Sequence, residues 1–174
     1  MRGIGEAVDS PLTLLEETHF VVHELLAGGR PELHGRYRSI SGWALEFPPA
    51  VRPPISLGVV GPKSLHLSGR VADGTVLGED HDPDAVRRAR TLIDLGRAEA
   101  ARTDSHHVTV FVSFFVGSPE DAPTPPPETP VGGELVGSAD EVMSGVAALG
   151  EAGADSVILV PLSNPDTQFR ALGV

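Results

Sequence analysis

The residues best suited to chemistry lie in a short turn between an apolar run and a helix-like stretch. Val60, Gly61, Pro62, Lys63 and Ser64 close the apolar run 55–60 and open a segment with helical spacing. The N–H groups and the dipole at a helix start favour an anion. Gly61 permits close approach to the backbone, and Lys63 and Ser64 offer a charge and a hydroxyl. The sequence therefore predicts an anion-binding turn, against the simpler interpretation of an ordinary strand–helix turn with an exposed lysine.

Two further clusters of titratable residues are weaker candidates. In the segment 78–82 the acidic and histidine side chains crowd one short stretch that fixes no geometry, so a solvated turn with Asp82 as a helix cap is the better interpretation. Asp104, His106 and His107 precede a predicted strand and so belong to the amino end of the sheet. In barrels that end usually serves stability rather than catalysis. Neither cluster predicts a metal site.

Two histidines, His19 and His23, lie one helical turn apart in the first predicted helix. The pattern lacks the matching glutamate and third ligand of the known zinc motif, so a partly exposed helix face is expected and no metal is assigned. The sequence also has no Gly-x-Ser-x-Gly, no P-loop and no Gly-x-Gly-x-x-Gly. Nucleophilic hydrolysis and nucleotide phosphoryl transfer therefore lack support.

Length and charge exclude several classes of protein. The chain has 174 residues, 16 of them proline and 20 glycine, with no cysteine. A complete (β/α)₈ barrel takes about 250 residues, so a full-sized barrel is excluded, and one domain is the default. The net charge of −11 disfavours nucleic acid. No apolar run approaches a membrane span and no signal-peptide stretch is seen, so a cytoplasmic location without membrane contact is the expectation.

Helices and strands alternate along most of the chain. Capping residues and apolar spacing predict helices at 11–26, 62–72, 82–101, 139–153 and 165–172. Apolar runs predict strands at 55–60, 75–77, 108–116 and 157–161. Prolines and glycines predict a long loop at 30–54 and a mobile linker at 117–133 within a single domain, 1–174.

This order predicts an α/β fold with parallel βα units. Three of the strands are nearly continuous apolar runs, which is typical of a parallel sheet covered by helices. Elementary patterns leave two architectures open, a small doubly wound sheet and a section of a barrel.

Three stretches decide between them by resemblance. They are LLAGGRPELHGRYRSISGWALEFPP at 25–49, PISLGVVGPKSLHLSGRVADGTVLG at 54–78 and GSADEVMSGVAALGEAGADSVILVP at 137–161. In sequence and order they resemble the C-terminal half of the luciferase-like flavin and deazaflavin oxidoreductases, and the second stretch is the most specific. The resemblance implies a partial (β/α)₈ barrel whose four strands match barrel strands five to eight.

The resemblance also implies a cofactor and a function. Members of this family are luciferase-like monooxygenases and related enzymes that bind FMN or the deazaflavin coenzyme F-420 (F420) and transfer hydride to or from a small organic substrate. In them the turn that corresponds to residues 60–64 lies near the phosphate-bearing side chain of the cofactor. The first half of the barrel, which carries the substrate chemistry, has no counterpart here, so no catalytic residue is assigned. A truncated or split enzyme is expected, or an inactive remnant or interaction subunit that forms a homodimer or complements a separate half-barrel.

Overall fold

The computed structural model describes residues 8–78, 81–123 and 133–173. Four strands run parallel and neighbour one another in chain order: β3 (Ser56–Gly58), β4 (Gly74–Leu77), β5 (His107–Val116) and β7 (Ser156–Pro161). A fifth strand, β6 (Leu135–Gly137), pairs in parallel with the last residues of β5, on the side opposite β7. The carboxyl ends of the strands therefore lie along one edge of the sheet.

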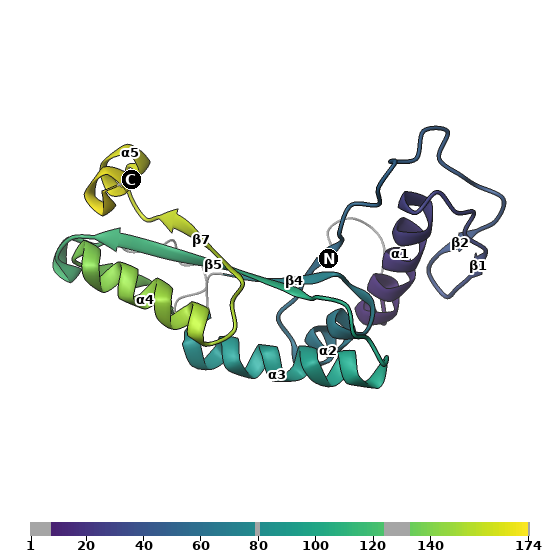
Figure 1. Ribbon diagram of the computed structural model, residues 1–174, viewed down its shortest axis with the longest axis horizontal. Helices are drawn as coiled ribbons and strands as arrows, with labels where there is room; N and C mark the ends of the chain where they lie inside the picture. Colours follow the sequence, from purple (N-terminus) through teal and green to yellow (C-terminus); the bar gives the residue numbers. More distant parts are fainter. Residues whose placement is uncertain (1–7, 79–80, 124–132, 174) are drawn as a thin grey trace.

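Three helices cover one face of this sheet: α2 (Pro62–Val71), α3 (Pro83–Glu99) and α4 (Ala139–Glu151) (Figure 1). Pro62 occupies the first turn of α2, which has no side-chain cap, whereas α3 and α4 begin at side-chain caps. Asp82 accepts the Ala85 N–H at 2.6 Å, and Ser138 forms a full capping box with Glu141. These caps satisfy N–H groups that have no partner within the helix, which is why the helices begin where they do.

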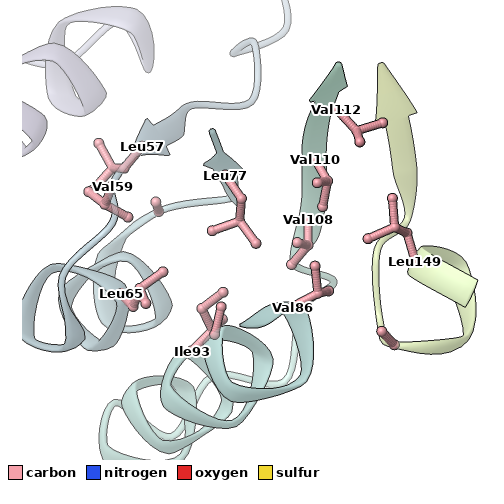
Figure 2. Close-up of a cluster of buried hydrophobic side chains, with 13 residues drawn as sticks. Leu57, Val59, Leu65, Leu77, Val86, Ile93, Val108, Val110, Val112 and Leu149 are labelled. Atoms are coloured by element: carbon pink, nitrogen blue, oxygen red, sulfur yellow. The ribbon is translucent and has the colours of Figure 1, made fainter. Parts of the chain in front are cut away.

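The core lies between this face and the helices (Figure 2). Alternate strand residues point toward the helices, as expected for a period of two. They are Leu57, Val59, Leu77, Val108, Val110 and Val112, packed with Leu65, Val86, Ile93 and Leu149 of the helices. Glycines bring α2 and α3 very close, because a Cβ on Gly96 would lie 2.0 Å from the His66 carbonyl oxygen.

The opposite face of the sheet is much less covered. Helices α1 (Pro11–Leu26) and α5 (Pro165–Leu172) lie at opposite ends of an elongated molecule (Figure 1). Between them Ile158 of β7 remains 41% exposed. Beside α1, the long segment after it carries large exposed apolar side chains, with Trp43 at 70% and Phe47 at 85% exposure.

The structure confirms the α/β class, the parallel strand order and the existence of all five predicted helices. Two short elements were missed, β6 and the hairpin of β1 (Leu33–His34) and β2 (Ser39–Ile40) inside the predicted loop. They contain three and two residues per strand, too few for a periodic pattern.

The predicted linker at 117–133 lies mostly outside the described residues, so its character stays a prediction. Its described beginning forms a short 3₁₀ turn at Pro119–Asp121. In the part of the chain that is described, no helix combines the length and apolarity needed to cross a membrane.

Candidate functional site

The predicted turn lies at the carboxyl edge of the sheet, between β3 and α2. Gly61 is the N-cap residue of α2 in an extended conformation, and Pro62 occupies the first helical turn. The Ser64 and Leu65 N–H groups donate to the Gly61 carbonyl oxygen at 3.0 and 2.9 Å. The Ser64 hydroxyl donates to the same oxygen at 2.9 Å. Its hydrogen is therefore already used inside the turn, so Ser64 shapes the turn rather than offering a donor to a ligand.

A cavity of about 300 Å³ opens beside this turn, between the starts of α2 and α3. Two of its lining residues follow β3 and one follows β4, as expected where carboxyl ends of parallel strands share an edge. The lining residues are Val60, Pro62, Leu65, His81, Ala85, Arg88, Ala89 and Leu92. Six of these eight residues have apolar side chains, and the other two, Arg88 and His81, bring a guanidinium and an imidazole to the wall.

Three of the five predicted residues line a space in the structure, and they do not all line the same one, whereas Gly61 and Ser64 line neither. Val60, 62% exposed, and Pro62 line the cavity. Lys63 instead lines a separate groove of about 350 Å³ with Glu16, His66 and Arg70, between α1, α2 and α3. Pro62 borders both spaces. The prediction that all five residues bind one ligand stays a prediction. Lys63 lines the groove and not the cavity, and Pro62 lies between the two spaces.

Arg88 lines the cavity but is not among the residues predicted from the sequence. It lies one turn into α3, and among the described residues neither Arg88 nor Lys63 forms an ion pair, whereas the adjacent Arg87 pairs with Asp84. Arg88 shares the cavity with Val60, Pro62 and Leu65 of the preceding strand–helix unit, a tertiary contact that no local pattern contains. The cavity therefore has a positive charge available for an anionic ligand.

His81 lines the cavity but is buried and makes a structural contact. It is 6% exposed, and its Nδ1 lies 3.1 Å from the Gly78 carbonyl oxygen. Asp82 serves as the cap of α3, as predicted. Glu79 and Asp80, the other acidic residues of that run, lie outside the described residues.

The amino edge of the sheet holds a network of paired charges. Asp73 accepts two hydrogen bonds from Arg52, at 2.6 and 3.0 Å, and one from the Ile55 N–H at 2.8 Å. These bonds, led by the Arg52 pair, lower the pKa of Asp73 to about 2. Arg102 lies 3.7 Å from Asp73 and also pairs with Asp104. Asp104 is thus engaged in an ion pair, in keeping with a role in stability.

His106 ends a buried chain of hydrogen bonds at the same edge. Its Nε2 lies 2.9 Å from the Thr75 hydroxyl, which lies 2.7 Å from the Ser68 hydroxyl. Ser68 donates to the Gly74 carbonyl oxygen, so it must accept from Thr75, which in turn must accept from His106. Burial lowers the pKa of His106 to about 4. His106 is therefore neutral at pH 7, with its proton on Nε2.

His107 and the long loop make structural contacts. His107 lies on the exposed side, with Nε2 2.8 Å from the Ser156 hydroxyl. The Glu17 carboxylate accepts the N–H groups of Arg36, Tyr37 and Arg38 at 2.6 to 2.8 Å, which pins the loop to α1. No group of three or more histidine, cysteine or acidic side chains is placed to hold a metal in the described ranges.

A parallel sheet with a ligand-sized cavity at its carboxyl edge defines the class of α/β proteins that bind cofactors at this edge. The model of the luciferase-like monooxygenase family matches residues 1–125, and the chain belongs to this family. The predicted resemblance is confirmed.

Two curated relatives extend this similarity. One, an F420-dependent glucose-6-phosphate dehydrogenase of Microbacterium testaceum, is 31% identical over 90 residues, which is 51% of this chain and 27% of that protein. The other, a 5,10-methylenetetrahydromethanopterin reductase of Archaeoglobus fulgidus, is 29% identical over 119 residues, which is 68% of this chain and 35% of that protein.

Two solved structures share the fold. An F420-dependent secondary alcohol dehydrogenase in complex with an F420–acetone adduct matches with a TM-score of 0.80 and 17% identity, over 98% of this chain and 62% of that one. The coenzyme F420-dependent tetrahydromethanopterin reductase of Methanopyrus kandleri matches with a TM-score of 0.74 and 19% identity, over 97% and 63%. The chain thus spans less than two thirds of each of these relatives.

Proposed function

We propose that this chain contributes to an F420-dependent oxidoreductase and that the carboxyl-edge cavity, with the turn at residues 60–64, contacts the cofactor. The observation that carries the proposal is the cavity itself, where Arg88 lies without an ion pair in the described chain and shares the wall with the apolar side chains of Val60 and Pro62. The names of the relatives support F420 over FMN, because three of them state F420 dependence. A deazaflavin carries the hydride, and the protein binds and orients it.

The residues of the site fit different parts of such a cofactor. An apolar wall suits a planar ring system or an aliphatic linker, and a guanidinium suits a phosphate or carboxylate in a bidentate contact. The Lys63 ammonium borders the neighbouring groove and adds positive charge at the same helix start. No residue of this chain is assigned to the hydride transfer itself, and the small organic substrate is not specified.

The test is a titration of the purified chain with F420 and, separately, with FMN, followed by cofactor fluorescence. Arg88→Ala and Lys63→Ala are each expected to weaken F420 binding about tenfold, since a charge-assisted contact contributes about 1.5–3 kcal/mol when desolvated and less at an exposed position. Arg87→Ala is the matched control, because Arg87 neighbours Arg88 but pairs with Asp84 and does not line the cavity.

Three outcomes would count against the proposal. Equal effects of Arg87→Ala and Arg88→Ala would show that only general charge matters. Tighter binding of FMN than of F420 would exclude the deazaflavin assignment. Absence of binding of either cofactor at high micromolar concentration would favour a second candidate function.

That second candidate is an interaction subunit that is not itself an enzyme. It is supported by the exposed Ile158 on the less covered sheet face, and by β3 and β7, each of which pairs with one strand only in the described part of the chain. Unpaired strand edges attract other strands. A second copy, or a chain with complementary βα units, would cover both edges. Sedimentation of the purified chain decides this point, and a compact 18.2 kDa monomer would contradict it.

A further inference from the structure

Two histidines of α1 face a common cavity and are unused by the proposed function. His19 is 7% exposed, and its Nε2 has no hydrogen-bond partner in the described structure. His23 lies one turn later, with its ring centroid 5.9 Å from that of His19 and the ring planes inclined by 32°. The sequence reading expected a partly exposed face here, and for His19 that expectation is wrong. A buried nitrogen without a partner points to a group that binds it.

The neighbouring carboxylate fixes the tautomer of His23. Its Nδ1 lies 3.3 Å from Glu24 Oε1, and a carboxylate accepts a proton donor only, so Nδ1 carries the hydrogen. The lone pair of His23 is therefore on Nε2. A carboxylate that holds the other ring nitrogen is the arrangement found behind most metal-bound histidines.

The spacing of the two rings fits one ion between them. A Zn–N bond of about 2.0–2.1 Å on each side limits the centroids of two imidazoles on one ion to about 6 Å apart. Histidines at i and i+4 on one helix face also supply the two imidazoles of known zinc sites. The cavity between them measures about 340 Å³. Its lining residues are Glu16, His19, Phe20, His23, Glu24 and Val71.

The surrounding charges favour a cation. Glu16 and Glu24 border the cavity, and Arg70 is paired with Glu16 at 3.2 Å and with Glu99 at 3.6 Å. The two guanidinium groups that act on His19, those of Arg52 and Arg102, lie 2.6 and 3.7 Å from Asp73, whose carboxylate offsets their charge. Because no third histidine, cysteine or acidic ligand is placed to join the pair within the described residues, a closed structural zinc site is excluded. A metal ion bound here would have two imidazole nitrogens, from His19 and His23, as its protein ligands, and its other coordination positions would be open.

We propose that His19 and His23 bind one divalent transition-metal ion through their Nε2 atoms, with water in the open positions. Imidazole ligands select Cu²⁺, Ni²⁺ and Zn²⁺ over Mg²⁺ and Ca²⁺, which require oxygen ligands, and Cu²⁺ binds most tightly.

The test uses the tag-free chain and Ni²⁺ in isothermal titration calorimetry at neutral pH. One ion per chain is expected, and His19→Gln and His23→Gln should each reduce the affinity at least tenfold. His34→Gln is the matched control, because His34 is an exposed histidine outside α1. Mg²⁺ at the same concentration should give no binding heat. An affinity unchanged in the His19→Gln/His23→Gln double variant, or a stoichiometry other than one, overturns the proposal.

A measurement on the unaltered chain covers the case in which a variant does not fold. Cu²⁺ bound at one equivalent should show, in electron paramagnetic resonance, hyperfine coupling to two imidazole nitrogens. Coupling to one nitrogen or to none overturns the two-histidine site. Binding of F420 is measured separately, so failure of the metal site and failure of the proposed cofactor function are independent results.

Discussion

Acidification should destabilise this fold through His106, well before its carboxylates are protonated. The ring is 5% exposed and its pKa is lowered to about 4, whereas an unfolded histidine has its ordinary value near 6.5. Below pH 6.5 the unfolded chain therefore takes up a proton that the folded chain does not bind. Stability contributed by the neutral ring is full above pH 6.5 and falls as the pH approaches 4.

The size of the effect follows from the difference between the two pKa values. Each pH unit in this window costs about 1.4 kcal/mol, so roughly 2 kcal/mol is lost between pH 7 and pH 5 and about 3 kcal/mol by pH 4. A domain of this size is stable by only about 5–15 kcal/mol, so the change is easily measured. Asp73 does not interfere, because its pKa is lowered and its stabilisation is lost only below about pH 4.

Urea unfolding followed by circular dichroism at pH 7, 6 and 5 is the assay, on the unaltered chain and on His106→Gln. Glutamine can still donate to Thr75 but does not titrate, so the loss between pH 7 and pH 5 should shrink by about 2 kcal/mol. A smaller dependence of the free energy of unfolding on pH should remain in His106→Gln, because burial also lowers the pKa of His19. His107→Gln, an exposed neighbour, is the control. If His106→Gln keeps the full slope of the unaltered chain, the reasoning is refuted.

Three further substitutions test the packing and the two edges of the sheet. Gly96→Ala should destabilise the fold by more than 2 kcal/mol, because the added Cβ would lie 2.0 Å from the His66 carbonyl oxygen. Gly150→Ala is the control, because no atom lies within 4 Å of its added Cβ, and it should be neutral or stabilising by up to about 1 kcal/mol. Urea unfolding measures both changes in the free energy of unfolding. Asp73→Asn should lower the free energy of unfolding by about 2–4 kcal/mol at pH 7, because it removes the negative charge that Arg52 and Arg102 share. Asp84→Asn is the exposed control. An equal loss in the two variants would contradict a stabilising role for the ion pairs of Asp73. Ser138→Ala should cost about 1 kcal/mol through loss of the capping box, measured as a shift in the thermal midpoint, and Ser144→Ala on the same helix is its comparison.

The sequence predicted those parts of the fold that depend on neighbouring residues. Helix starts were found because Ser10, Asp82 and Ser138 each cap the N–H groups two or three residues later. Strand positions were found because apolar runs such as 108–116 are typical of strands in a parallel sheet, although β5 is fully buried on one face and only partly buried on much of the other. Both signals lie within a few residues of the element they define, so one sequence is enough to detect them.

The contacts that fix the loops and the site could not be found in this way. Glu17 binds N–H groups about 20 residues away, and Arg52 pairs with Asp73 across a separation of 21. Arg88 lines its cavity together with Val60 and Pro62, which lie more than 20 residues earlier in the chain. In each case the partner is set by the tertiary fold, and nothing in the local pattern distinguishes these charged residues from others on a helix or loop.

The two edges of the sheet differ in how fully their polar groups are used, and this difference supports the cofactor site proposed above. At the amino edge Asp73 accepts three hydrogen bonds and the Ser68–Thr75–His106 chain uses each hydroxyl twice, although the buried His106 Nδ1 has no hydrogen-bond partner among the described residues. At the carboxyl edge Arg88 and Lys63 form no ion pair in the described chain. In a chain of net charge −11, such cations are where an anionic cofactor meets the least repulsion. The residues that stabilise this fold and those that are available to a cofactor are thus separated by the length of the strands.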